Sequence, residues 1–179
     1  RFAARFAPLG FRVAPETLDL MRRIVARGEL AALVPERGWG ETERALGEDR
    51  PTAYFEVLHG CGALGAVFPE IAALDGVPQP AQWHPEIDTF VHTMQVLEVA
   101  AELSRDTTVR FAALVHDLGK GLTPREDWPS HVGHEEAGVR LIEQIAARLR
   151  LPTEHRDLAL LVARHHARAH RVAEQRPGT

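Results

Sequence analysis

Histidine and aspartate side chains at helical spacing carry the clearest chemical signal in this sequence. His116 and Asp117 are adjacent in the segment ALVHDLGKG, and His92 lies earlier, in DTFVHTMQVLEVAAELS. Both histidines are expected on apolar helix stripes, where the charge of Asp117 needs a counter-ion. Two imidazoles and a carboxylate brought together by antiparallel helices suit a divalent metal with positions open for water. For any single histidine, the alternative is a core residue satisfied by a carbonyl group.

Further polar residues extend this set. Lys120, the only lysine, follows where the helix is expected to end, free to reach an anionic substrate or simply to favour the helix dipole in solvent. His134, in SHVGHEEAG, is expected in the first turn of a helix, where the dipole keeps its imidazole neutral and available as a ligand, or where it caps the helix. His165 and His166 end a later stripe and are either additional ligands or surface residues.

The elements that must position these residues are expected to be helices throughout, because no segment has the strict alternation of a strand. Asp88 is a suitable cap for a helix through Ser104. On that helix His92 shares a stripe with Val96, Val99 and Leu103. The sequence therefore predicts an all-α fold in which successive helices each supply one or two of the candidate residues.

Proline and glycine mark the other expected helix boundaries. Pro15 opens a helix that stops at Gly28, and further helices are expected over 35–47, after Pro51 and from Pro69. The stretch 77–86 breaks helical structure and serves as the expected domain boundary. Beyond it, a helix from Asp106 or Thr107 ends at Gly119, and two more cover 134–150 and 153–168.

Composition excludes several classes of protein. The chain has 179 residues, 45% of them hydrophobic, and a formal net charge of -4, which fits a folded globular protein. Its single cysteine, Cys61, cannot form an intramolecular disulfide, and no window approaches the roughly 20 apolar residues of a membrane span. We therefore expect a cytoplasmic protein. Residues 140–179 carry 8 basic and 4 acidic side chains, which suits contact with phosphate, although a genome rich in G and C also favours arginine.

The motifs together resemble a known family. His92, the adjacent His116 and Asp117, GHEEAG and a late HH pair are similar to the HD superfamily of metal-dependent phosphohydrolases. The segments RFAARFAPLGF, PERGWGETERAL, CGAL, FPEI, HPEIDT and WPSHVGHEEAG resemble the bacterial CCA-adding tRNA nucleotidyltransferases that carry an HD domain. The resemblance implies a helical neck and body segment over 1–76 that contacts tRNA, a linker over 77–85, an HD-type helical bundle over 86–170 and a basic tail over 171–179.

The resemblance also implies an activity. It suggests a 2',3'-cyclic phosphodiesterase, 2'-nucleotidase and phosphatase that uses a divalent metal, with Ni²⁺ expected first and Mn²⁺, Co²⁺ or Mg²⁺ as alternatives. The expected partners are the tRNA 3' end and 2',3'-cyclic or 2'-phosphorylated nucleotides, with no membrane, in a monomer or homodimer. The family's polymerase head, which binds Mg²⁺, has no counterpart in this sequence, so CCA addition is not expected from this chain alone.

These expectations combine into one mechanistic hypothesis and one rival. His92, His116 and Asp117 hold the metal, which acidifies a water and polarises a phosphoryl oxygen, while Lys120 and His134 stabilise developing charge. Relatives commonly supply a further aspartate on the last helix, where this chain has Ala167 after its histidines. His134, His165, His166 or water would then complete the shell, or the carboxylate would lie beyond Thr179. The rival is a helical scaffold that binds tRNA or dimerises and whose HD motif has become structural.

Overall fold

The protein folds entirely into helices, as the sequence predicts. The computed structural model describes residues 1–81 and 86–170, so part of the expected linker and the whole expected basic tail lie outside the described residues. Within the described ranges there is no strand, only an isolated bridge between Pro78 and Asp88. The α-helices are α1 Phe2–Phe6, α2 Pro15–Ala26, α3 Pro35–Leu46, α4 Thr52–Gly60, α5 Leu64–Val67, α6 Pro69–Ala72, α7 Thr89–Leu103, α8 Thr107–Val115, α9 His134–Leu149 and α10 Thr153–His170.

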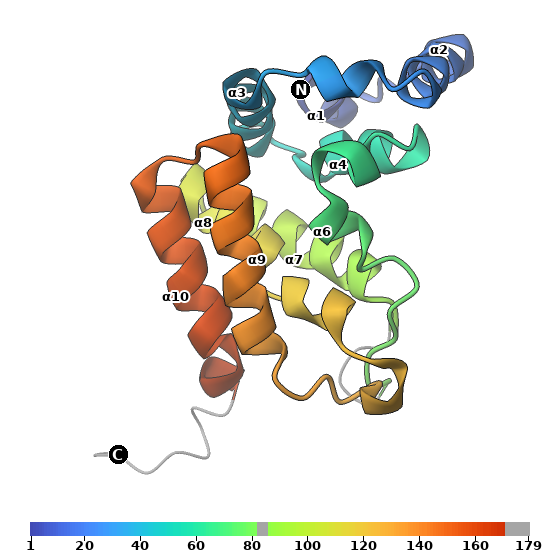
Figure 1. Ribbon diagram of the computed structural model, residues 1–179. Coiled ribbons are helices and arrows are strands. Elements are labelled where there is room, and N and C mark those ends of the chain that lie inside the picture. Colours follow the sequence, from blue (N-terminus) through green and yellow to red (C-terminus); the bar gives the residue numbers. More distant parts are fainter. Residues whose placement is uncertain (82–85, 171–179) are drawn as a thin grey trace.

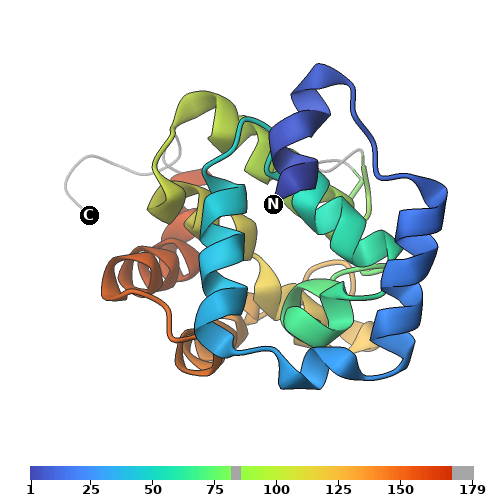
Figure 2. The same cartoon turned by 90° about the horizontal axis from the view of Figure 1, so that it is seen from above.

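The helices form two groups that lie one above the other (Figure 1). Helices α1 to α4 occupy the upper part of that view, and α7 to α10 form a bundle below them, with α9 and α10 side by side. Helix α10 packs on both α8 and α9, and α7 packs on α8. Seen from above, α3 lies between α1 and the pair α9 and α10 (Figure 2), so α3 joins the upper group to the bundle.

Helix starts follow the local sequence closely. Pro15 and Pro35 each occupy the first position of a helix, where the missing N–H costs nothing. The Asp88 carboxylate accepts a hydrogen bond from Val91 N at 2.9 Å and caps α7. Asp106 caps α8 in the same way. These starts are predicted correctly because capping depends on side chains only a few residues away.

The end of α8 differs from the prediction. The helix ends at Val115, and four short 3-10 helices occur in the described chain: η1 Ala7–Leu9, η2 Glu29–Ala32, η3 Leu118–Leu122 and η4 Arg125–Asp127. Gly119 lies inside η3, where a Cβ atom would be 1.8 Å from the backbone oxygen of His134. Gly119 is therefore required for the close approach of η3 to α9 and does not act as the helix stop.

One hydrophobic core runs through both groups of helices. It extends from Trp39 in α3 to Ala163 in α10, and its fully buried members include Phe55 and Phe68 before the expected boundary at 77–86 and Phe111 after it. The expected boundary thus separates two stretches of sequence, but the described residues on its two sides share one core.

A buried arginine adds a polar connection between the same two groups. Arg110, in α8, is 1% exposed and has no carboxylate among its hydrogen-bond acceptors in the described chain. Its guanidinium donates instead to four backbone carbonyls, those of Leu46, Glu48, Ala101 and Ser104. Leu46 and Glu48 lie at the end of α3 or just after it, and Ala101 and Ser104 lie at the end of α7. Arg110 therefore joins α8 to the ends of α3 and α7.

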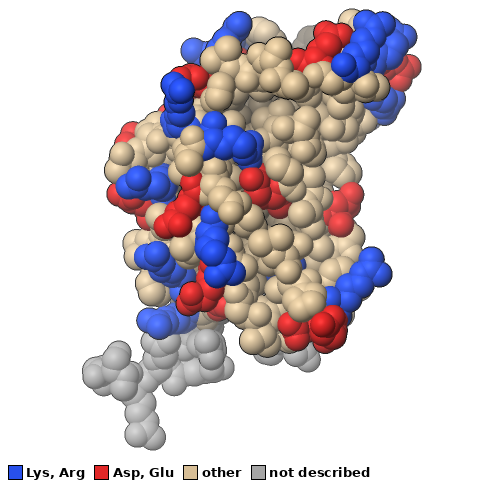
Figure 3. Space-filling view, viewed as in Figure 1, with Lys and Arg blue, Asp and Glu red and all other residues tan. Residues whose placement is uncertain are grey.

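The surface carries mixed charge. Basic and acidic side chains alternate along α9 and α10, and both kinds also lie together at the upper right, over α2 (Figure 3). None of the described helices has the length and apolar character that crossing a membrane requires.

Candidate metal centre

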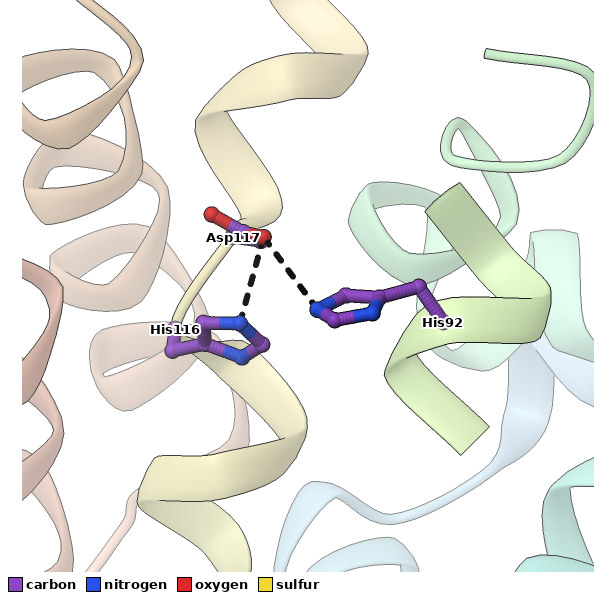
Figure 4. A group of neighbouring side chains, drawn as sticks. All are labelled: His92, His116 and Asp117. Atoms are coloured by element: carbon purple, nitrogen blue, oxygen red, sulfur yellow. Dashed lines mark ion pairs between the residues drawn. The ribbon is translucent and has the colours of Figure 1, made fainter. Parts of the chain in front are cut away.

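Four helices bring four imidazoles around one buried carboxylate. His92 comes from α7, His116 and Asp117 directly follow α8, His134 begins α9 and His166 lies in the last turns of α10. His92 and His116 point toward the carboxylate in Figure 4, with Nε2 at 3.9 and 3.1 Å from Asp117 Oδ2. Nε2 of His134 and His166 lie 3.4 and 3.2 Å from Asp117 Oδ1. All four imidazoles therefore face the carboxylate of Asp117 through Nε2.

The opposite ring nitrogen of each histidine is held by an acceptor. Three Nδ1 atoms lie within hydrogen-bond distance of the carbonyl three residues earlier, and the fourth lies near a carboxylate: His116 to Ala113, His134 to His131, His166 to Ala163, and His92 to Glu86. Carbonyl and carboxylate oxygens only accept, so each Nδ1 carries the proton. In the neutral ring the lone pair then lies on Nε2, which faces Asp117.

This arrangement calls for a cation at the centre. Asp117 Oδ1 is buried and no described side chain is oriented to hydrogen-bond it, although two imidazoles approach it. Nε2 of His134 and His166 also face one another at 3.3 Å, which places two lone pairs in contact when both rings are neutral. A divalent ion resolves both problems, because it accepts the lone pairs and neutralises the carboxylate. The donor set of imidazole and carboxylate suits such an ion.

The electrostatics of the cluster favour an ionised carboxylate and positive charge beside it. Burial alone raises the pKa of Asp117, but the facing imidazoles of His116, His134 and His166 outweigh it and hold the pKa well below its ordinary value of 3.8. Burial lowers the pKa of His134, yet Asp117 more than reverses this and raises it above 6.5. A metal ion would compete with a proton for His134.

Asp117 is shared by two groups of potential ligands. His92, His116 and Asp117 form one group, and Asp117, His134 and His166 form the other. In each group the ligand atoms lie within 4.8 Å of one another. The described residues thus offer two sets of potential ligands that share Asp117.

Lys120 has a different environment from the one expected. Instead of standing free at a helix end, its ammonium is buried and donates to Asp117 Oδ2 at 2.6 Å and to Gln79 Oε1. The cause is the turn of η3, which folds the lysine back over the preceding aspartate. Lys120 therefore holds Asp117 in place and is not directed at solvent.

The structure places the remaining candidate histidines differently from one another. His166 joins the cluster because it follows Ala159 and Ala163 on the buried face of α10, whereas His165 is exposed and lies outside both ligand groups. His92 does not lie on the buried stripe of α7, because Val99 and Leu103 are 53% and 81% exposed. The buried stripe of α7 runs instead through Phe90, Met94 and Leu97, and His92 stands at its edge.

Sequence reasoning missed the residues that support the cluster. Gln79 and Glu86 come from the stretch 77–86 interpreted as the domain boundary, yet they contact Lys120 and His92. The sequence assigned no function to His131, yet it is buried and bonds Pro78 O and Thr123 Oγ1. The HPEIDT motif was a usable signal, because it ends three residues before His92 and its Glu86 had no assigned use.

Comparison with known proteins agrees with this geometry. Residues 89–177 match the model of the HD domain, and residues 10–74 match the model described as the probable RNA and SrmB- binding site of polymerase A. The whole chain is 62% identical to the Multifunctional CCA protein of Thioalkalivibrio sulfidiphilus and 59% identical to that of Nitrosococcus oceani. The chain is thus similar over its whole length to part of the Multifunctional CCA proteins.

This similarity to the Multifunctional CCA proteins confirms the resemblance drawn from the sequence. All five residues of the cluster lie within the part that matches the HD domain, whose presence implies binding of a divalent metal. The chain spans 44% and 43% of the two relatives' lengths, so less than half of a Multifunctional CCA protein is described by this sequence.

Proposed function

We propose that the chain is the phosphohydrolase part of a CCA-adding enzyme and acts as a 2',3'-cyclic phosphodiesterase, 2'-nucleotidase and phosphatase. The observation that carries the proposal is the convergence of four imidazole Nε2 atoms on the buried carboxylate of Asp117. Its substrates would be the tRNA 3' end and nucleotides with a 2',3'-cyclic or 2'-phosphate. Nickel is the proposed metal, since imidazole ligands suit it well.

The proposed ligands are His92, His116 and Asp117, with His134 and His166 as the further donors. When bound, a divalent ion supplies Lewis-acid chemistry, acidifying water and polarising a phosphoryl oxygen. The carbonyls behind the rings hold each Nε2 toward the centre, and Lys120 fixes the rotamer of Asp117. Relatives commonly carry an aspartate on the last helix, where this chain has Ala167. In this proposal His166 takes the place of that aspartate as a ligand, because its Nε2 lies 3.2 Å from Asp117 Oδ1.

We further propose that residues 1–76 contact tRNA. Support comes from the RNA-binding model that matches residues 10–74. A protein acting on tRNA would work in the cytoplasm. Phosphate contacts weaken steeply with salt, so binding of tRNA to this chain is expected to fall as the salt concentration rises.

Metal content and hydrolysis test the proposal together. Elemental analysis of the purified chain is expected to find metal in a stoichiometric amount, and 2',3'-cyclic AMP is expected to be hydrolysed with added Ni²⁺, Mn²⁺ or Mg²⁺. His116→Ala and Asp117→Asn are expected to reduce hydrolysis to background while far-UV circular dichroism keeps its helical signal. Asn at position 117 retains an oxygen for the Lys120 ammonium, which limits the cost of leaving that charge unpaired.

The same measurements also distinguish the proposed hydrolase from the main alternative, a helical RNA-binding scaffold. Equal hydrolysis by wild type and both variants would refute the site. No metal, no turnover and salt-sensitive tRNA binding would instead establish a helical RNA-binding scaffold with an inactive HD motif. Hydrolysis of nucleoside triphosphates in preference to the cyclic phosphate would leave the metal site intact but overturn the proposed substrate.

A further inference from the structure

The residues between the two matched regions pack against the metal centre. Residues 10–74 match one model and residues 89–177 the other, so positions 75–88 belong to neither. In the structure Val77 and Gln79 are buried, and backbone hydrogen bonds join this segment to the start of α7: Gln79 N to Ile87 O, Thr89 N to Val77 O. The described part of the segment is thus a fixed part of the site.

Glu86 reaches the centre from this segment. Its Oε1 lies 2.7 Å from Nδ1 of His92, and the Glu86 side chain is 9% exposed. Since Nε2 of His92 faces Asp117, the carboxylate and the candidate metal position occupy opposite sides of one imidazole. A carboxylate behind a ligand histidine fixes the ring and raises its strength as a donor.

The backbone that delivers Glu86 adopts an unfavourable conformation. Ile87 has a φ of 59°, in the left-handed region that branched side chains disfavour, and is 48% exposed. The turn is held from both sides, because Gln79 N donates to Ile87 O and the Asp88 side chain accepts from Gly76 N while capping α7. Such strain persists only where surrounding contacts enforce it, and it is commonly found at functional sites.

His92 differs from its three neighbours in this respect. The other imidazoles of the cluster donate from Nδ1 to neutral backbone carbonyls, whereas the acceptor for His92 is a carboxylate. Hydrogen bonds to an ionised acceptor are about twice as strong as those between neutral groups. The strength of His92 as a ligand therefore depends on a single side chain outside the HD match.

We propose that Glu86 is a positioning residue that holds His92 in its Nδ1–H tautomer and sets the affinity of the centre for its metal. The inference rests on the proposed function for its metal, but the orientation of His92 is a property of the chain itself. Glu86 acts through His92 and does not touch substrate.

Two variants separate the charge of Glu86 from its hydrogen bond. Glu86→Gln keeps an oxygen that can accept from Nδ1 but removes the charge, and Glu86→Ala removes both. Glu135→Gln is the matched control, because Glu135 also lies near a ligand histidine, 3.5 Å from Nδ1 of His134, while that nitrogen bonds the carbonyl of His131. Calorimetric titration of the metal-free chain with Ni²⁺ is expected to give about a 10-fold weaker Kd for Glu86→Gln and about a 10- to 100-fold weaker Kd for Glu86→Ala.

The expected control result is a Kd for Glu135→Gln within about threefold of wild type. Nitrogen-15 NMR of the metal-free chain is expected to show the Nδ1–H tautomer of His92 in wild type and Glu86→Gln, and a mixture of tautomers in Glu86→Ala. Wild-type affinity for both Glu86 variants, or an unchanged tautomer in Glu86→Ala, would overturn the inference. Failure of wild type itself to bind Ni²⁺ would refute the proposed function, and the tautomer measurement would still decide the role of Glu86.

Discussion

Helices α2 and α9 have similar amphipathic sequences, but only α9 buries its apolar face. Helix α9 buries one whole face, formed by Ala137, Gly138, Leu141, Ile142, Ile145, Ala146 and Leu149. No residue of α2 is buried, and Leu20 within it is exposed. Apolar side chains on either side of α2 are also open to solvent: Phe2, Leu9, Phe11, Leu33 and Val34. The period of apolar residues thus predicts a helix in both places, but it does not predict whether this chain covers the helix's apolar face.

The difference in burial between α2 and α9 extends to the two parts of the chain that contain them. The bundle of α7 to α10 is held by internal packing, which fixes five side chains around one point. The first 34 residues present a broad surface with little packing beneath it, and the RNA-binding match begins within them. Substitutions in the bundle should therefore cost more stability than equivalent ones in the N-terminal residues, and the following predictions test this.

Gly119→Ala is expected to have the largest effect on stability. The new methyl group would overlap the backbone of His134 and Gly138, which cannot move aside as a flexible side chain can. We expect a loss of about 3 kcal/mol or more in the free energy of unfolding, measured by urea denaturation, and a loss of metal binding as η3 moves from α9. A fully stable variant would show that the approach of η3 to α9 is looser than described.

Arg110→Met is expected to be nearly as costly. Four backbone carbonyls lose their donor, two of them at the end of α3, and we expect a loss of about 3 kcal/mol. Hydrogen exchange should accelerate first in α3, since the bundle keeps its own packing.

Arg105→Met is the matched control for Arg110. Arg105 is exposed and pairs with exposed Asp49 at 3.2 Å, so its loss should change stability by less than about 1 kcal/mol. An equal effect of the two arginine variants would argue against a special role for the buried guanidinium.

Gly40→Ala should change stability in the opposite direction from Gly119→Ala. Gly40 lies inside α3, and a Cβ atom there would meet nothing within 4 Å. Alanine favours the helix by about 0.5–1 kcal/mol over glycine, so the melting temperature is expected to rise. A lower melting temperature would mean that the fold does not tolerate a side chain at position 40 of α3.

The smallest effect concerns the cap of α8. Hydrogen bonds from the Thr108 hydroxyl and backbone N–H lower the pKa of Asp106 below 3.8. A lowered pKa in the folded state means that the stabilisation is present above the unfolded value and is lost as pH falls through the folded one. The stability difference between wild type and Asp106→Asn should be constant from about pH 5 to 7 and shrink below about pH 4. A difference that grows in acid would contradict the assigned cap.

Local patterns made much of the fold predictable. Helix starts at Pro15, Pro35, Asp88 and Asp106 depend on neighbouring residues, and so does the recognition of His116 beside Asp117. The site was less predictable wherever a contact joins distant segments. Neither Gln79 bonding Lys120 nor Glu86 bonding His92 follows from helical spacing, because each depends on how an irregular segment turns back over the bundle. The same limit explains why Lys120 was expected to reach a substrate or solvent, when it instead bonds Asp117.

The bonds of Arg110 have a consequence for how the chain can be divided. A fragment that began at residue 86 would keep the whole metal cluster, yet it would leave Arg110 without the carbonyls of Leu46 and Glu48 and Phe111 without its edge-to-face contact with Trp39. We therefore expect the two regions that match separate family models to unfold together. The RNA-binding match and the HD match are separate in the sequence, but neither region is expected to fold as a free-standing module without the other.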